Sequence, residues 1–232
     1  MCIKKIISLL FFVIVSLPMA AQWRVGVTVG ETYNHYSIDT HYMTDLHFED
    51  AWGKILTGKS SIPFGTLGIM GQYDVNEWFG IRADLNWTIK GYRQYRTLVT
   101  TDLETMNNYL LLPIMASFSV GGKNLRGFFN LGGYCGYWFN STSQGSQYAI
   151  TGVTGRWNNE FNNTRDQRFD CGLVSGVGVE WIFQLWKQKW VWHVVEAKLY
   201  YNMLSSQKDY MIIKDSRYNT TLVLQSGLNY SF

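Results

Sequence analysis

The sequence predicts an all-β fold, an eight-stranded antiparallel up-and-down barrel that spans a membrane. The last segment of the chain alternates apolar with small or polar residues at a period of two, which is typical of a strand with one face in lipid. Aromatic residues make up 16% of the 232 residues, and 22 are Gly. After the first 21 residues no run approaches the roughly 20 apolar residues of a transmembrane helix. This composition favours a membrane barrel over the alternative, a secreted soluble β-sandwich.

Residues 1–21 have the features of a cleaved signal peptide. Lys4 and Lys5 precede an apolar run at 6–15, and the small residues Ala20 and Ala21 follow. We expect cleavage after Ala21, which leaves residues 22–232 as one barrel domain. The remaining chain has 18 basic residues (20 − 2) and 17 acidic residues, a net charge of +1. This balance gives no electrostatic footprint for nucleic acid binding.

Eight segments have the length of about ten residues that a tilted spanning strand needs. In the clearest one, about 78–92, Ile81 and Leu85 share one face while Arg82 and Asp84 share the other. The remaining seven strands are expected at about 23–32, 62–74, 107–120, 126–140, 168–183, 190–204 and 218–232.

The connections between these segments alternate in length. Those after the second, fourth and sixth strands are short, whereas long loops are expected at about 33–61, 93–106, 141–167 and 205–217. Short periplasmic turns and long outer loops are the pattern of outer-membrane barrels, and aromatic residues gather at both ends of the strands as two girdles. We expect the barrel to close by pairing residues 25–30 with 221–228. The alternative is a ten-stranded barrel, in which the first or third loop adds a hairpin within the membrane.

The C-terminal strand carries a candidate assembly signal. Leu228, Tyr230 and Phe232 lie on its apolar face, and the chain stops on the aromatic residue. This ending resembles the signal that the outer-membrane assembly machinery reads. The expected partners are therefore the lipid bilayer and that machinery, and the expected location is the outer membrane of a Gram-negative cell envelope.

The mature chain as a whole resembles the PorT-like family of small outer-membrane barrels of the Bacteroidota type, and more distantly the OmpX/OmpA-type barrels. The resemblance rests on the Ala-Gln cleavage site, the opening "VGVTVG", the segment "YLLLPIM" at 109–115 and the terminal aromatic residue. It implies an eight-stranded barrel, and some relatives serve in a protein-export apparatus. The family more often has a Glu where this chain has Leu111, so any role of that carboxylate is lost or moved.

Six charged residues are expected on the face of the strands that lines the barrel interior, three of each sign. They are Arg82, Asp84, Lys90, Glu180, Glu196 and Lys198. They could form a path for protons or ions. The favoured interpretation is a neutral, ion-paired plug, because an eight-stranded barrel is just wide enough for side chains to fill it and buried charges must pair.

Neither a metal site nor a catalytic site is expected. The first loop contains His35, Asp39, His41, Asp45, His47, Glu49 and Asp50, but a spacing of six between histidines fits no zinc motif, and a solvated loop is favoured. No G-x-S-x-G motif occurs, and His193 is expected to face lipid beside Trp192. The expected function is a non-enzymatic structural or partner-binding envelope protein without cofactors.

Two alternatives to that function remain open at this point. One is a barrel enzyme that acts on lipid or peptide, and the other is a narrow solute channel. In the favoured function an unknown protein or surface ligand contacts the outer loops, of which the third is polar and rich in Asn (Asn158, Asn159, Asn162 and Asn163).

Cys135 and Cys171 lie on the fifth and sixth expected strands, both on the lipid-facing side. A hairpin centred near Val153 would place them opposite each other. A disulfide could then form in an oxidising periplasm and would close a loop of 36 residues (171 − 135). The alternative is two separate thiols, since a register shift of two residues would separate the Cα atoms too far.

Overall fold

The computed structural model describes residues 22–40, 55–56, 65–96, 101–147, 153–164, 166–206, 208 and 215–232. The signal peptide expected at 1–21 lies outside these residues. Ten strands are described: β1 (Gln22–Thr40), β2 (Ile55–Leu56), β3 (Thr66–Asp74), β4 (Phe79–Arg96), β5 (Thr101–Gly121), β6 (Leu125–Gln147), β7 (Val153–Asn158), β8 (Phe169–Leu185), β9 (Gln188–Asn202) and β10 (Asp215–Ser231). Within the described residues, no helix is long and apolar enough to cross a membrane.

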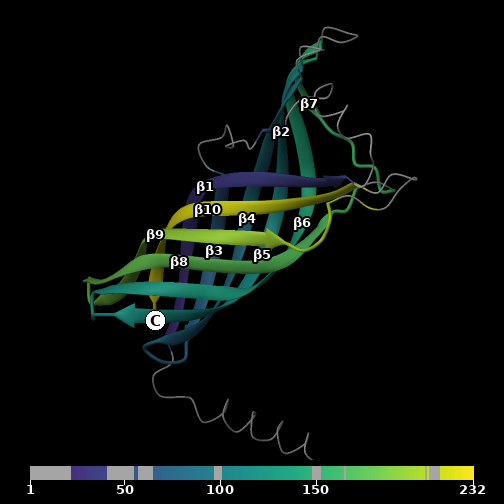
Figure 1. The fold of residues 1–232 in the computed structure, drawn as a ribbon. Helices are drawn as coiled ribbons and strands as arrows, with labels where there is room; N and C mark the ends of the chain where they lie inside the picture. Colours follow the sequence, from purple (N-terminus) through teal and green to yellow (C-terminus); the bar gives the residue numbers. More distant parts are fainter. Residues whose placement is uncertain are drawn as a thin grey trace, which may run out of the picture.

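Eight of these strands close an antiparallel barrel in the order β1, β3, β4, β5, β6, β8, β9, β10 (Figure 1). The barrel closes through the β1–β10 ladder, which runs from Arg24↔Ser231 to Thr40↔Asp215. Residues 25–30 lie opposite 230–225, a few residues nearer the C-terminus than expected. Closure leaves the wall without the unpaired strand edges that lipid cannot solvate. The predicted fold class is therefore confirmed.

Strands β2 and β7 lie outside this ring. The two residues of β2 pair with β4, and β7 pairs only with the outer end of β6, from Thr142↔Asn158 to Gln147↔Val153. The third expected loop thus contributes a strand, but that strand extends the sheet and does not widen the barrel. The barrel therefore has the eight strands that were predicted and not the ten of the alternative.

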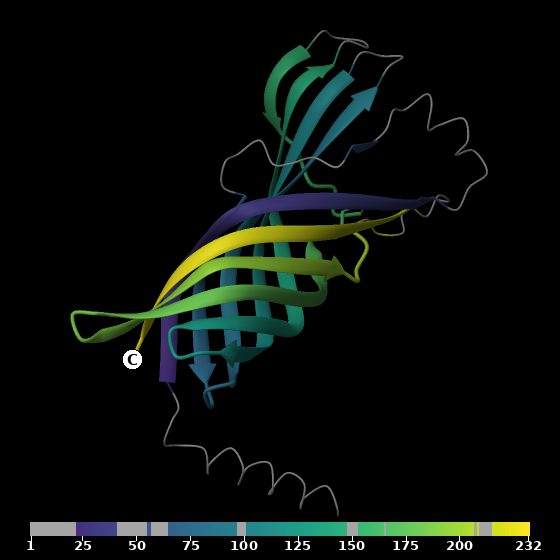
Figure 2. The ribbon, with the colours of Figure 1, turned by 60° about the vertical axis from the view of Figure 1, so that its left-hand side comes forward.

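The outer ends of β4, β5 and β6 continue into segments that were expected to be loops. The expected loop boundaries at 93 and 141 are wrong, because β4 and β5 pair as far as Arg96↔Thr101 and β6 runs to Gln147. These strand ends and β7 form what we call the raised sheet (residues 91–96, 101–108, 140–147 and 153–158). In Figure 2 the raised sheet stands above the barrel, whereas the outer ends of β1 and β10 stay paired and turn away from it.

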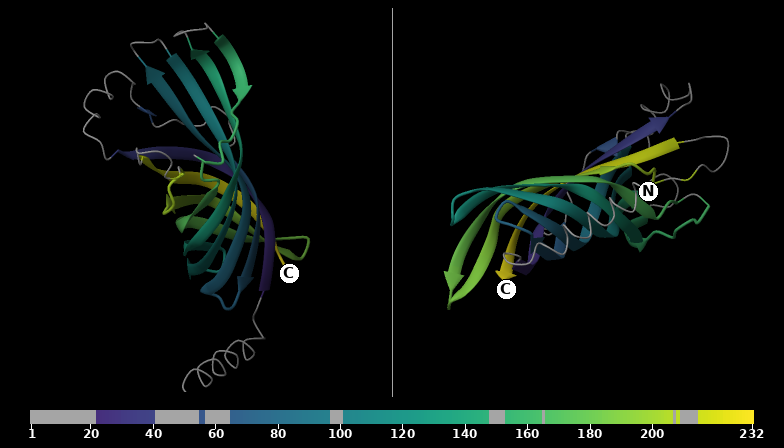
Figure 3. Two further views of the ribbon diagram at one scale, coloured as in Figure 1. Left: turned by 90° about the vertical axis from the view of Figure 1, so that its right-hand side faces the viewer. Right: turned by 90° about the horizontal axis from the view of Figure 1, so that it is seen from below.

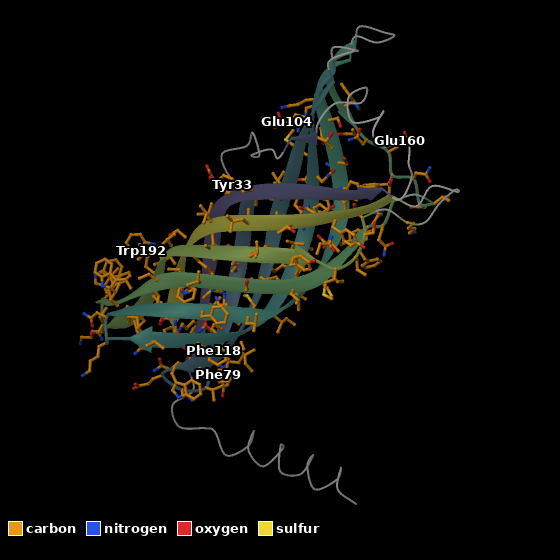
Figure 4. All side chains as sticks on the ribbon, in the orientation of Figure 1. Tyr33, Phe79, Glu104, Phe118, Glu160 and Trp192 are labelled. Atoms are coloured by element: carbon orange, nitrogen blue, oxygen red, sulfur yellow. The ribbon has the colours of Figure 1, made fainter. Side chains whose placement is uncertain are left out.

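The barrel wall separates apolar from polar side chains, as the period of two predicts. On β4, Ile81, Leu85 and Trp87 are exposed on the outer surface, whereas Arg82 and Asp84 are buried inside. Aromatic residues gather at the strand ends. Figure 4 shows Phe79 and Phe118 at the short-turn end, where their ring centroids lie 5.3 Å apart, and Glu104 and Glu160 at the opposite end.

A β-bulge in β9 interrupts this alternation. In the ladder with β10, Gln225 pairs with Glu196 but Gly227 pairs with His193, so β9 has one residue more than its partner. The consecutive residues Val194 and Val195 consequently both face outward. A bulge of this kind reverses the faces of every residue on one side of it.

The turn between β8 and β9 projects at the short-turn end of the barrel (Figure 3). Its two residues, Trp186 and Lys187, have φ values of 49° and 65°, which is the left-handed region that non-glycine residues seldom adopt. Two successive residues with positive φ define the type I′ turn that suits the twist of a two-residue hairpin. The side chain of Trp186 is 87% exposed.

Candidate functional site

The barrel interior holds a central cluster of four ion-paired side chains. Arg82 donates to both carboxylate oxygens of Asp84, at 2.8 and 3.1 Å, and to Glu196 at 3.1 Å. Lys198 pairs with Asp84 and lies 3.8 Å from Glu196. All four side chains are at most 1% exposed. Charges removed from water need such partners, because each unpaired ion would cost several kcal/mol.

Asn130 and Gln225 donate further hydrogen bonds to the Glu196 carboxylate. The Asn130 side-chain amide donates to one carboxylate oxygen at 2.9 Å, and Gln225 donates to the other at 2.7 Å. Gly176 leaves room for this arrangement, since a Cβ atom there would lie 3.2 Å from both Glu196 Oε1 and Lys198 Cγ. The cluster is therefore shaped by small residues of the neighbouring strand as well as by charge.

A second group of ion pairs lies toward the short-turn end. Arg24 pairs with Asp74 through Nε, and its terminal nitrogen lies 2.8 Å from Glu180 Oε2. Gln72 donates to the other Asp74 oxygen at 2.7 Å. Sequence reasoning found Glu180 but missed Arg24 and Asp74. The signal for Arg24 was present, because it shares the polar parity of Gly26 and Thr28 on the first strand.

The third group joins Lys90 to Asp170. Lys90 Nζ lies 2.5 Å from Asp170 Oδ2 and 4.6 Å from the centre of the Tyr109 ring. The Tyr134 hydroxyl donates to the other Asp170 oxygen at 2.9 Å. Asp170 also went unnoticed, because it lies only two residues from the expected start of its strand, where parity gives little information.

His193 occupies a position that contradicts the sequence-based expectation. It was expected to face lipid, but it is 2% exposed and lies inside, 3.5 Å from Glu180 Oε2 and 3.9 Å from Glu196 Oε2. Its ring packs on Phe128 at a centroid distance of 4.8 Å. The cause is the bulge at Val194 and Val195, which no simple period of two can anticipate.

An apolar and aromatic cluster fills further space inside the barrel. Leu111 is fully buried in it, together with Tyr134 and Tyr200. The two tyrosine rings meet edge to face at 5.1 Å, and Asn86 donates to the Tyr200 hydroxyl at 3.3 Å. Leu111 thus contributes to packing inside the barrel.

The six charged residues expected inside the barrel are all buried and ion-paired, but the set is larger than expected. Within the described residues, the ion-paired cations of the interior are Arg24, Arg82, Lys90 and Lys198, and the carboxylates are Asp74, Asp84, Asp170, Glu180 and Glu196. Four permanent cations face five carboxylates, and His193 lies between two of the latter. Such an arrangement can hold a barrel interior closed. Its polar side chains are also groups between which protons can be transferred.

The comparison with protein families decides the class of this chain. The family model described as "Outer membrane protein beta-barrel domain" matches residues 17–208. The chain belongs to this outer-membrane β-barrel family. Its members' location in the outer membrane agrees with the apolar outer wall and aromatic ends of the barrel. No curated protein matches the chain.

Several solved structures are similar in fold to this family member at low identity. The attachment invasion locus protein Ail of Yersinia pestis, crystallised with a heparin analogue, is 14% identical over 92% of this chain and 100% of its own (TM-score 0.41). Neisserial surface protein A is 11% identical over 92% and 100% (TM-score 0.45). The outer membrane protease OmpT of Escherichia coli is 10% identical over 91% and 97% (TM-score 0.41).

The three residues of the expected assembly signal lie at the C-terminal end of β10, beside the start of β1. Leu228 and Phe232 are exposed on the outer wall, and Tyr230 contacts Phe232 edge to face at 4.8 Å. The Phe232 amide donates to the Trp23 carbonyl at 2.9 Å, so the chain end is also part of barrel closure.

Most of the possible metal ligands in the first expected loop lie outside the residues that the structure describes. His35 and Asp39 belong to β1, whereas His41, Asp45, His47, Glu49 and Asp50 lie outside the described residues. Among the described residues, no group of three or more His, Cys, Asp or Glu side chains could hold a metal ion.

Proposed function

We propose that this outer-membrane barrel is a non-enzymatic envelope protein that binds a partner with its raised sheet. The observation that carries the proposal is the way this sheet is braced. Asn159, just after β7, donates to the hydroxyls of Ser141 at 2.9 Å and Ser143 at 2.7 Å on β6. Ser141 in turn donates to Asn107 on β5 at 2.8 Å. A polar sheet held in one shape can present a surface to a partner at little further entropic cost.

The base of the raised sheet supports the same proposal, because it is hollow. A hollow of about 680 Å³ lies against the outer wall beside the outer end of β3, where that strand begins at Thr66. Its lower part is apolar, with Val29, Leu67 and Trp87, and its upper part carries Asn140 and Arg156. A mixed apolar and polar concave surface of this size suits an anchoring side chain of a protein partner.

The interior of the barrel argues against the two alternatives. A solute channel needs an open path, whereas here buried ion pairs and packed tyrosines occupy the interior. A barrel enzyme needs an accessible base, and the one histidine whose side chain the structure describes, His193, lies between Glu180 and Glu196 and is 2% exposed.

Photo-crosslinking in living cells tests the partner proposal. A photoreactive amino acid at Glu160, which is exposed beside the raised sheet (Figure 4), should give a discrete adduct with one partner. The matched control is Gln188, which is also exposed but is the first residue of β9, beside the turn at the opposite end. The variant Asn159→Ala, which removes the brace, should weaken the Glu160 adduct. Adducts at Gln188 alone would contradict the proposal.

The narrower assignment to the PorT-like family is also a proposal. The segment "YLLLPIM" at 109–115 and the opening "VGVTVG" favour it, and a role beside a protein-export apparatus would follow from it. Co-purification from native membranes, followed by mass spectrometry, tests it. Recovery of export components with the barrel would support that role, and their consistent absence would remove it.

A further inference from the structure

Cys135 on β6 and Cys171 on β8 are direct partners in the barrel wall. They lie two pairs from the outer end of the β6–β8 ladder, which stops at Tyr137↔Phe169. Both side chains are on the outer wall, where Cys135 is exposed and Cys171 is partly exposed. Their sulfur atoms are 3.1 Å apart.

The hydrogen-bond pattern of this ladder shows what kind of pair they form. The Trp138 amide donates to the Arg168 carbonyl, and at the other end the Ile182 amide donates to the Asn124 carbonyl. Pairs of even-numbered residues therefore exchange backbone hydrogen bonds, and odd-numbered pairs such as Cys135↔Cys171 do not. Non-hydrogen-bonded pairs have Cα atoms about 4.5 Å apart and the closer side chains. That separation lies within the range of about 4.4–6.8 Å that a disulfide tolerates.

We propose that Cys135 and Cys171 are a disulfide site, closed in the mature barrel as an intramolecular bond. The inference depends on the fold and the location of the chain and not on the proposed partner binding. Chains destined for the outer membrane pass through an oxidising compartment, in which disulfides persist. Because the two thiols meet across adjacent strands of a closed wall, the bond requires no rearrangement of the backbone.

The oxidant is a protein or small molecule that carries a reactive disulfide. The thiolate of one cysteine attacks that disulfide and forms a mixed disulfide, and one oxidant sulfur leaves as a thiol. The second cysteine then attacks the first cysteine's sulfur in the mixed disulfide, and the other oxidant sulfur leaves. Overall, the two cysteines lose two protons and two electrons, and the oxidant becomes a dithiol.

The bond would close a segment that includes β7 and the outer part of β6. On one side the outer part of β6 is paired with β5 throughout, and on the other side its pairing with β8 stops at Tyr137↔Phe169. A covalent link two pairs from that end limits fraying of the β6–β8 ladder.

Peptide mass spectrometry of the unreduced protein tests the inference. Barrels purified from outer membranes are denatured with iodoacetamide present and digested with trypsin, which releases residues 127–156 and 169–187, each with one cysteine. We expect the two peptides joined, about 2 Da lighter than their sum, in protein that migrates as a monomer on unreduced gels. Separate, alkylated peptides, or a link found only in a dimer band, would overturn the inference.

A variant with its cysteine moved by two residues is the matched control. Gly133 faces outward on the same strand, lies opposite Leu173, and has room for a Cβ atom, which would be 3.6 Å from the nearest backbone oxygen. In the double variant Cys135→Ser, Gly133→Cys, the two cysteines are diagonal neighbours with Cα atoms about 7–8 Å apart, too far for a disulfide. We expect full alkylation of this variant. If this variant forms an intramolecular disulfide as readily as the native chain does, the direct pairing of Cys135 with Cys171 is not what favours the bond.

Discussion

Glu196 is the residue on which the interior depends most. Its two oxygens accept hydrogen bonds from Arg82, Asn130 and Gln225, and no part of its side chain is exposed. In Glu196→Ala, the two cations Arg82 and Lys198 would have to share one carboxylate, that of Asp84. Loss of one partner of a buried pair costs about 3–5 kcal/mol.

We therefore expect Glu196→Ala to lower the free energy of unfolding by about 3–5 kcal/mol. Urea-induced unfolding in lipid vesicles, followed by tryptophan fluorescence, measures it. Glu160→Ala, at an exposed position, is the control and should change stability by less than about 0.5 kcal/mol. Equal effects for the two variants would mean that the pair is not buried.

Residues on an uninterrupted stretch of strand could be predicted from the sequence. Arg82, Asp84, Glu196 and Lys198 follow the period of two, and all four lie inside. His193 could not be predicted, because the extra residue at Val194–Val195, between His193 and Glu196, reverses the face of the strand. Bulges depend on pairing with neighbouring strands, which a single strand's pattern does not contain.

At the scale of elements, the bulge of β9 can be tested by deletion. Removing Val194 would leave Val195 alone opposite Ser226 and restore a regular alternation, with His193 and Glu196 both still inside. We therefore expect the deletion to keep the compact, heat-modifiable form on unheated gels. Val194→Ala keeps the bulge and should also fold like the native chain. Loss of the compact form in the deletion alone would show that the wall needs the bulge.

The β8–β9 turn offers a second test at this scale. Lys187 has a φ of 65°, a conformation that costs a non-glycine residue about 1 kcal/mol. Lys187→Gly should therefore raise the free energy of unfolding or leave it unchanged. At Gln188, where no positive φ occurs, the same change to Gly should lower it. Denaturant unfolding compares the two variants. Equal destabilisation by both would show that the backbone at Lys187 is not strained.

For the whole molecule, the eight strands and their order followed from the sequence because the lipid-facing pattern repeats in every strand. The raised sheet did not follow. The outer ends of β4, β5 and β6 and the strand β7 are mostly polar with scattered apolar residues, such as Leu103, Met106 and Trp157, so no alternation distinguishes them from loops. Their pairing is visible only in the ladders that join them.

The central claim is that this barrel is closed and its interior is filled by ion-paired and aromatic side chains. Conductance of the purified protein in planar lipid bilayers tests it most directly, with a general porin inserted by the same procedure as a control. The filled interior predicts no stepwise conductance for this protein under conditions in which the porin gives clear steps. Stable, porin-type steps that scale with the amount of inserted barrel would contradict the claim.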